Sequence, residues 1–287
     1  MKVKKLLKDD SSYPAVLRDI PSPPKELYYL GAAPETWLTR LRVAIVGSRG
    51  ITPYGRAVTT ELATQLAERG VTIVSGLALG VDAVAHEAAV KAGGMHIAVL
   101  ANGLDQIYPA TNTDLARRLL QTGGAIVSEY PAGMPSLKQN FIARNRVVAG
   151  LAQALLITEA TAQSGTLHTA RFALEQGRDV LVVPGNITSP ASVGCNNLIK
   201  AGALPVTCVE DILPILGAKN LTATTYVHRG DTAEEQTVLD LLYTGVSNGH
   251  DLMRETALDP TIFTQTLTML ELAGKIYPLG NNHWAPR

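Results

Sequence analysis

The sequence has little of several features that mark whole classes of protein. Only 2 of its 287 residues are cysteines, Cys195 and Cys208, which are too few for a disulfide framework or a four-ligand zinc site. We expect both to be reduced thiols in a cytoplasmic protein. Aromatic residues make up 5% of the chain. Lys and Arg together number 25, as do Asp and Glu, so no strong global field of either sign attracts a ligand.

Long hydrophobic runs are also missing. The longest uncharged apolar run, residues 147–158, is too short to cross a bilayer, and the first ten residues do not resemble a signal peptide. Hydrophobic residues nevertheless make up 46% of the chain, enough for a sizeable core. The sequence therefore predicts a soluble protein with one large domain and a small one, and no membrane segment, metal or cofactor.

The middle of the chain alternates between short apolar runs and helical segments. Six uncharged runs are predicted to be strands: residues 43–46, 71–74, 97–100, 125–127, 154–157 and 180–183. Continuous apolar strands fit a parallel sheet that is buried on both faces. We expect residues 41–216 to form an α/β domain with an extended Rossmann-like, doubly wound, mostly parallel sheet. Five prolines interrupt residues 1–40, which are expected to be an irregular lead-in that packs on this core.

The C-terminal part has a different organisation. Residues 217–232 lack periodicity and are predicted to be a linker. Helices over 234–243, 252–258 and from Pro260, followed by a hairpin, predict a winged-helix domain over 233–287. Residues 231–287 carry 3 basic and 8 acidic side chains, and the third helix has no Lys or Arg. That balance favours a protein-docking or regulatory role over the alternative, a weak DNA-binding role.

Small polar residues follow several of the predicted strands, at the sheet edge where parallel α/β proteins bind ligands. Ser48 and Arg49 follow the first strand, Ser75 and Gly76 follow the second, and residues 164–166 open a helix after the fifth. Glycine allows the backbone to approach a ligand closely, and a helix N-terminus suits phosphate. With Arg49 among them, these residues favour an anionic ligand.

One stretch, residues 130–158, contains Lys138, Arg144 and Arg146 but no acidic residue. Three cations beside Phe141 suit a nucleic-acid backbone with one base stacked on the ring. We favour Lys138 as a residue that faces the ligand, and leave the two arginines open.

The alternative for the arginines is structural. They would pair with Glu129 and Glu159, two carboxylates that look buried and need partners. The same alternative applies to Arg49. Tyr108, which precedes a proline, is interpreted as part of a rigid turn.

Many of these residues together resemble the DNA-processing protein A (DprA/Smf) family, over about residues 13–210. The motifs, in order, are Ile45-Val-Gly-Ser-Arg49, Ser75-Gly-Leu-Ala-x-Gly-x-Asp82-x-x-Ala-His86, Ala98-Val-Leu-x-x-Gly103-Leu-Asp-x-x-Tyr108-Pro109, Ser128-Glu-x-Pro131, Phe141-x-x-Arg144-Asn-Arg146, Glu159-Ala-x-x-x-Ser164-Gly-Thr166 and Val183-Pro-Gly185. The predicted winged helix is similar to the optional C-terminal tail of this family.

The resemblance implies a non-enzymatic protein that binds single-stranded DNA in natural transformation and recombination. It implies that the protein protects incoming DNA and loads the RecA recombinase, as a homodimer. It also implies DNA contacts by Arg49, Lys138 and Phe141, and with them Arg144 and Asn145. The candidate DNA-binding residues are therefore Ser48, Arg49, Ser75, Gly76, Lys138, Phe141, Arg144, Asn145, Ser164, Gly165 and Thr166. The apolar residues Ile212, Leu213, Ile215 and Leu216 are a candidate dimer surface.

Two other functions are possible alternatives. The sheet and residues 164–166 are similar to nucleotide phosphoribohydrolases, whose signature is P-G-G-x-G-T-x-x-E. Here Ala162-Gln163 replaces the two glycines, and Thr169 stands at the position of the glutamate, so the agent of acid–base chemistry is missing. The other alternative is a sequence-specific regulator that acts through the winged helix.

Overall fold

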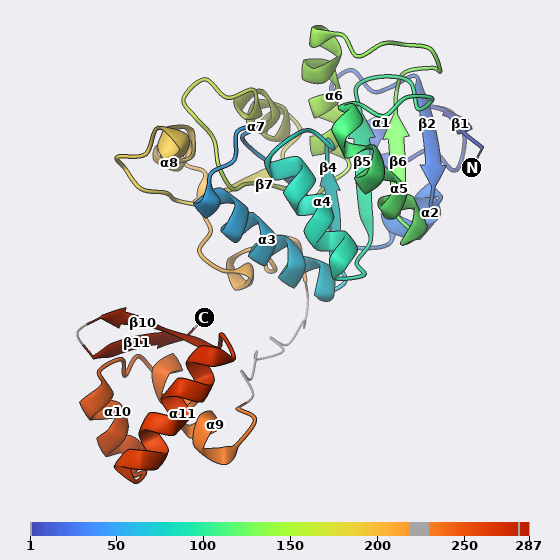
Figure 1. The fold of residues 1–287 in the computed structure, drawn as a ribbon. Coiled ribbons are helices and arrows are strands. Elements are labelled where there is room, and N and C mark those ends of the chain that lie inside the picture. Colours follow the sequence, from blue (N-terminus) through green and yellow to red (C-terminus); the bar gives the residue numbers. More distant parts are fainter. Residues whose placement is uncertain (1, 219–229, 281, 287) are drawn as a thin grey trace. The chain divides into compact units, whose positions relative to one another are not determined.

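The computed structural model describes residues 2–218, 230–280 and 282–286 (Figure 1). The chain divides into two units, residues 1–221 and 222–287. Most of the predicted linker, residues 219–229, lies outside the described residues.

The first unit is built on a nine-stranded sheet with the order β1-β2-β6-β5-β4-β3-β7-β8-β9. All neighbours from β6 to β9 pair in parallel, whereas β2 is antiparallel to both β1 and β6. The strands are β1 (Lys4–Leu7), β2 (Glu26–Gly31), β3 (Arg42–Val46), β4 (Thr72–Ser75), β5 (His96–Leu100), β6 (Ala125–Ser128), β7 (Ala154–Ile157), β8 (Asp179–Val182) and β9 (Leu204–Pro205). The six predicted strands are all present, with ends shifted by one residue at most, and the α/β fold class is confirmed.

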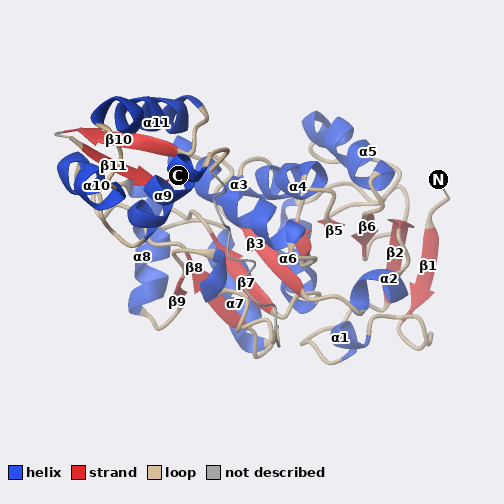
Figure 2. Ribbon diagram, turned by 90° about the horizontal axis from the view of Figure 1, so that it is seen from below, coloured by secondary structure: helices blue, strands red, loops and turns tan. Residues whose placement is uncertain are grey.

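Both faces of the sheet are covered, which explains why the strand sequences are continuously apolar. Val43 and Ile45 of β3 pack with residues of α3 (Pro53–Glu68) and α4 (Val81–Lys91). Ala44 and Val46, which point to the other face, pack with α6 (Lys138–Gly150) and α7 (Thr166–Glu175). Figure 2 shows helices on either side of the strands. The unit also contains α5 (Thr113–Gln121) and α8 (Val193–Lys200).

The prediction that residues 1–40 are irregular is wrong. They form β1, β2 and two short helices, α1 (Ala15–Arg18) and α2 (Pro34–Leu38). The prolines lie between these elements or at a helix start, where the missing N–H breaks no hydrogen bond. Trp37 and Leu27 are fully buried in the main core, so this segment is part of the domain.

The candidate dimer surface at the end of the first unit is also corrected. Ile212, Leu213 and Leu216 are buried in the core that covers β3, and Ile215 is partly buried against it. Their apolar character is explained by packing within one chain.

The described residues of the second unit form three helices and a two-stranded hairpin, the winged-helix arrangement. These elements are α9 (Ala233–Tyr243), α10 (Gly249–Thr256), α11 (Pro260–Leu272), β10 (Ile276–Gly280) and β11 (His283–Pro286). The helix α10 begins three residues earlier than predicted, because the side chain of Asn248 caps it by accepting from the backbone N–H of His250. Leu239, Leu252 and Leu270 form the centre of a separate small core.

Candidate nucleic-acid interface

A cavity of about 780 Å³ opens at the carboxyl edge of the parallel strands. Its walls come from the loops after β3, β4 and β7 and from the first half of α6. Nine of the eleven candidate DNA-binding residues line it: Ser48, Arg49, Lys138, Phe141, Arg144, Asn145, Ser164, Gly165 and Thr166. The expectation that ligand-binding residues gather beyond the strand ends agrees with this placement.

The other two candidates lie deeper. Ser75 is fully buried, and its hydroxyl donates to the carbonyl of Ile45 at 2.6 Å, so the predicted direct contact with a ligand is wrong for this residue. Gly76 is also buried, and it lines a small pocket of about 50 Å³. Arg49 and Phe141 line both this pocket and the main cavity. Ser75 and Gly76 shape the floor beneath the cavity.

Two cations and an aromatic ring lie together at this cavity. The Cζ atom of Arg49 is 5.2 Å from the centroid of the Phe141 ring, within the range of a cation–π contact. Lys138, the first residue of α6, lies one helical turn before Phe141. Arg49 and Lys138 are both exposed, and neither forms an ion pair with any residue that the structure describes.

The two nearby carboxylates already have other partners. Glu129 accepts two hydrogen bonds of 2.6 Å from the guanidinium of Arg146, in a bidentate ion pair. Glu159 is buried and accepts from the backbone N–H of Thr52 at 3.2 Å and from its hydroxyl. The structural alternative is therefore correct for Arg146 and not for Arg49.

Arg144 forms the floor of the cavity. It is buried, and its Nη1 donates to the carbonyl of Gly76 at 2.7 Å and to that of Val99. Burial lowers the pKa of this guanidinium, while the nearby Asp82 carboxylate raises it. Asp82 in turn accepts from the backbone N–H of Gly76 at 3.0 Å, and burial raises its pKa. These partners hold Arg144 in place where it lines the cavity.

The opposite wall is the start of α7. Ser164 donates to the hydroxyl of Thr166 at 2.9 Å and accepts from the backbone N–H of Thr166 at 3.2 Å. Gly165 between them is exposed. This turn therefore presents hydroxyls and a bare backbone to the cavity.

Sequence reasoning missed one aromatic residue of this site. Tyr108, interpreted as part of a rigid turn, lines the cavity, and its ring centroid is 5.4 Å from that of Phe141. Its position after the end of β5 was the available signal, because it places the ring at the same sheet edge. Asp82 is the one carboxylate among the lining residues, and the glutamate of the phosphoribohydrolase signature is replaced by the buried Thr169.

The fold and this cavity define a Rossmann-like binding protein with an appended winged-helix domain. In the described ranges no helix is long and apolar enough to cross a membrane, and no three metal-ligating side chains come together. Residues 4–217 match the family described as DNA recombination-mediator protein A, and residues 225–282 match the DprA winged helix domain. The chain belongs to the DprA/Smf family.

Individual relatives agree with this assignment. Protein Smf of Escherichia coli is 50% identical over 176 residues, which are 61% of this chain and 47% of that protein. The DNA processing protein DprA of Streptococcus pneumoniae is 42% identical over 204 residues, 71% of either chain. This chain thus matches about half of the E. coli relative and more of the S. pneumoniae one.

Two solved structures share the fold. DprA from S. pneumoniae superposes with a TM-score of 0.69 at 39% identity, over 74% of each chain. The Helicobacter pylori DNA processing protein A, described for its single-stranded DNA binding mode, gives a TM-score of 0.67 at 34% identity, over 75% of this chain and 95% of that one.

Proposed function

We propose that this chain binds single-stranded DNA in the cavity at the carboxyl edge of its sheet. The observation that carries the proposal is the placement beside Phe141 of Arg49 and Lys138, two exposed cations that form no ion pair with a described residue. Cations that follow the sugar–phosphate backbone and an aromatic surface for bases are what a single-strand site requires. The binding mode named for the H. pylori relative supports the same assignment.

The binding is proposed to be independent of base sequence. Arg49 and Lys138 suit contacts with phosphates, which position a strand without identifying its bases. The net charge of the chain is zero, so the attraction depends on these local cations rather than on a global field. Duplex DNA is expected to bind less tightly, since its bases are stacked in pairs and cannot reach an aromatic surface inside a cavity.

The wider role follows from family membership. We infer that the protein acts without catalysis, protects incoming single strands in transformation and recombination, and delivers them to RecA, as a homodimer. The replacement of the signature glutamate by Thr169 supports the non-enzymatic part of this inference.

The experiment is a comparison of labelled single-stranded and duplex DNA of equal length in fluorescence anisotropy, at several salt concentrations. We expect tighter binding of the single strand, with an affinity that falls as salt rises by a log–log slope of about −0.7 per neutralised phosphate. Equal affinities at moderate salt would contradict the proposal.

A further inference from the structure

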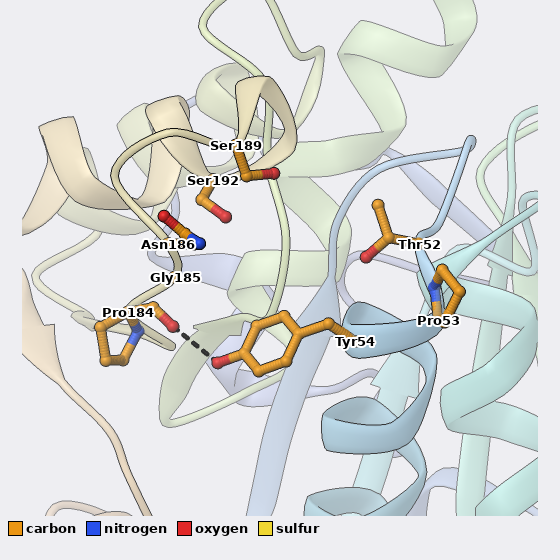
Figure 3. A pocket seen from close by; sticks show the side chains of 8 residues that line it. All are labelled: Thr52, Pro53, Tyr54, Pro184, Gly185, Asn186, Ser189 and Ser192. Atoms are coloured by element: carbon orange, nitrogen blue, oxygen red, sulfur yellow. Dashed lines mark hydrogen bonds between the residues drawn. The ribbon is translucent and has the colours of Figure 1, made fainter.

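A second pocket opens at the same edge of the sheet, between the first turn of α3 and the loop that follows β8 (Figure 3). Its volume is about 590 Å³, and its walls are mainly apolar. The lining residues are Thr52, Pro53, Tyr54, Pro184, Gly185, Asn186, Ser189 and Ser192. None of them is charged. Such a pocket suits a flat, neutral group with hydrogen-bonding edges better than it suits a phosphate.

Tyr54 offers this pocket a fixed aromatic surface. Tyr54 is 49% exposed, yet its hydroxyl donates to the carbonyl of Pro184 at 2.7 Å across the pocket (Figure 3). The side chain is thus held at both ends, at its Cα on α3 and at its hydroxyl. A ring that is already immobilised loses little further entropy when a ligand stacks on it.

The opposite wall is also organised in advance, and it carries two serine hydroxyls. The side chain of Asn196 donates to the carbonyl of Gly185 at 3.0 Å and accepts from its N–H at 3.2 Å, which holds the loop in place. Ser192 lines this wall, and its hydroxyl forms no hydrogen bond with a described residue. A serine hydroxyl can both donate and accept, so it can bind the polar edge of a ligand in the pocket.

The pocket lies close to the main cavity along the chain. Thr52 is three residues beyond Arg49, and three residues span at most about 11 Å between Cα atoms. Resting on the proposed function, we propose that this pocket holds a nucleobase of the same DNA strand, from a nucleotide that adjoins the phosphate at Arg49. Tyr54 stacks on the base, and Ser189 and Ser192 face its polar edge.

The test compares two strands of equal length, an oligothymidylate and an abasic strand that has only the sugar–phosphate backbone. For Tyr54→Ala we expect a loss of about 5- to 150-fold in affinity for oligothymidylate, the range for one stacked base. The abasic strand should bind this variant as it binds the wild type. Tyr54→Phe keeps the ring and should retain most of the affinity. Arg49→Ala, which removes a backbone contact, should weaken both strands.

The outcomes separate this inference from the proposed function. Wild-type affinity of Tyr54→Ala for oligothymidylate would overturn the inference and leave the proposed function intact. An equal loss on both strands would also overturn it, because Tyr54 would then only brace the loop. If Tyr54→Ala does not fold, Ser189→Trp fills the pocket from the other wall and should give the same base-dependent loss. If the wild type binds no single strand, both proposals are wrong.

Discussion

The guanidinium of Arg49 lies over the ring of Phe141, with Cζ 5.2 Å from the ring centroid. The ring holds the cation at the cavity by a cation–π contact. It does not neutralise the charge, whereas a carboxylate partner would. The charge of Arg49 therefore remains available to a phosphate, and its planar fork can donate two hydrogen bonds to one.

Replacing either exposed cation with alanine should weaken single-strand binding and leave folding unchanged. For Arg49→Ala and for Lys138→Ala we expect a loss of about 1–3 kcal/mol of binding free energy, the range for hydrogen bonds to charged groups. For each variant, the log–log slope of affinity against salt concentration should correspond to about one fewer neutralised phosphate. Arg117→Ala and Lys91→Ala, exposed cations on α5 and α4 outside the cavity, are the matched controls. A lower melting temperature with unchanged affinity would rule out the assigned role.

Arg146→Ala, in contrast, should lower the stability of the fold. It leaves the carboxylate of Glu129, which is 15% exposed, without its bidentate partner. Loss of one member of a buried pair should cost about 3 kcal/mol of unfolding free energy. Denaturant unfolding measures this, with Arg171→Ala as the control, because Arg171 forms an exposed pair with Glu175 that should matter by less than about 0.5 kcal/mol. Equal effects of the two substitutions would contradict the interpretation.

Gly76→Ala tests how tightly the cavity floor is packed. A Cβ atom at this position would lie 2.6 Å from the Cζ atom of Arg144, which cannot retreat without leaving the carbonyls of Gly76 and Val99. We expect a destabilisation of about 1–3 kcal/mol. At Gly165 a Cβ atom would meet open space, so the free energy of unfolding of Gly165→Ala should lie within about 0.5 kcal/mol of the wild-type value. Stability of Gly76→Ala equal to that of the control would show that Arg144 can move freely.

Stability should fall in acid because of a buried histidine. Burial lowers the pKa of His86 to about 3, and neither ring nitrogen has a hydrogen-bond partner among the described residues. Its ordinary pKa of about 6.5 applies to the unfolded chain, which therefore binds a proton as the pH falls below that value while the folded protein does not. His86 alone should remove about 2 kcal/mol of stability between pH 7 and pH 5.

The measurement is the unfolding free energy of the wild type and of His86→Leu at several pH values. The variant should lose less stability on acidification than the wild type. Some pH dependence should remain, since burial also lowers the pKa of His96. Parallel profiles for the two proteins would contradict the assignment to His86.

Removal of the second unit should leave single-strand binding largely intact. Residues 231–287 carry 3 basic and 8 acidic side chains, and α11 has no Lys or Arg to contact phosphates. A chain of residues 1–221 should bind oligothymidylate with nearly the affinity of the full chain, measured by anisotropy at the same salt. Loss of binding by orders of magnitude from a folded truncation would assign the DNA contact to the winged helix.

The sheet was predictable because its strands are buried on both faces and therefore read as uninterrupted apolar runs. The strand β2 was missed because prolines lie on both sides of it, and β1 was missed because it is largely exposed and has two lysines. At the site, strand ends identified the correct edge of the sheet, but sequence position could not distinguish exposed from buried residues. Ser75 is the last residue of β4 and Arg49 follows β3, yet the first side chain is buried and the second is exposed.

Partners of charged residues were even harder to predict. The sequence left three arginines and two glutamates to be matched, and only the folded chain shows that Thr52 rather than an arginine binds Glu159. A helix cap supplied by a threonine can satisfy a carboxylate as well as an ion pair can. Such a contact joins residues 107 positions apart, so no local sequence pattern predicts it.

The two outermost strands of the sheet limit how copies of this chain can associate. An unprotected edge strand invites another chain to continue the ladder of backbone hydrogen bonds, which leads to aggregation. Here one border is the four-residue β1, which has Lys4 and Lys5, and the other is the two-residue β9, which ends in a proline. Lysines hinder the approach of a new strand, and proline cannot donate to one. Two protomers would therefore meet through side-chain surfaces, and not by extending one sheet into the next.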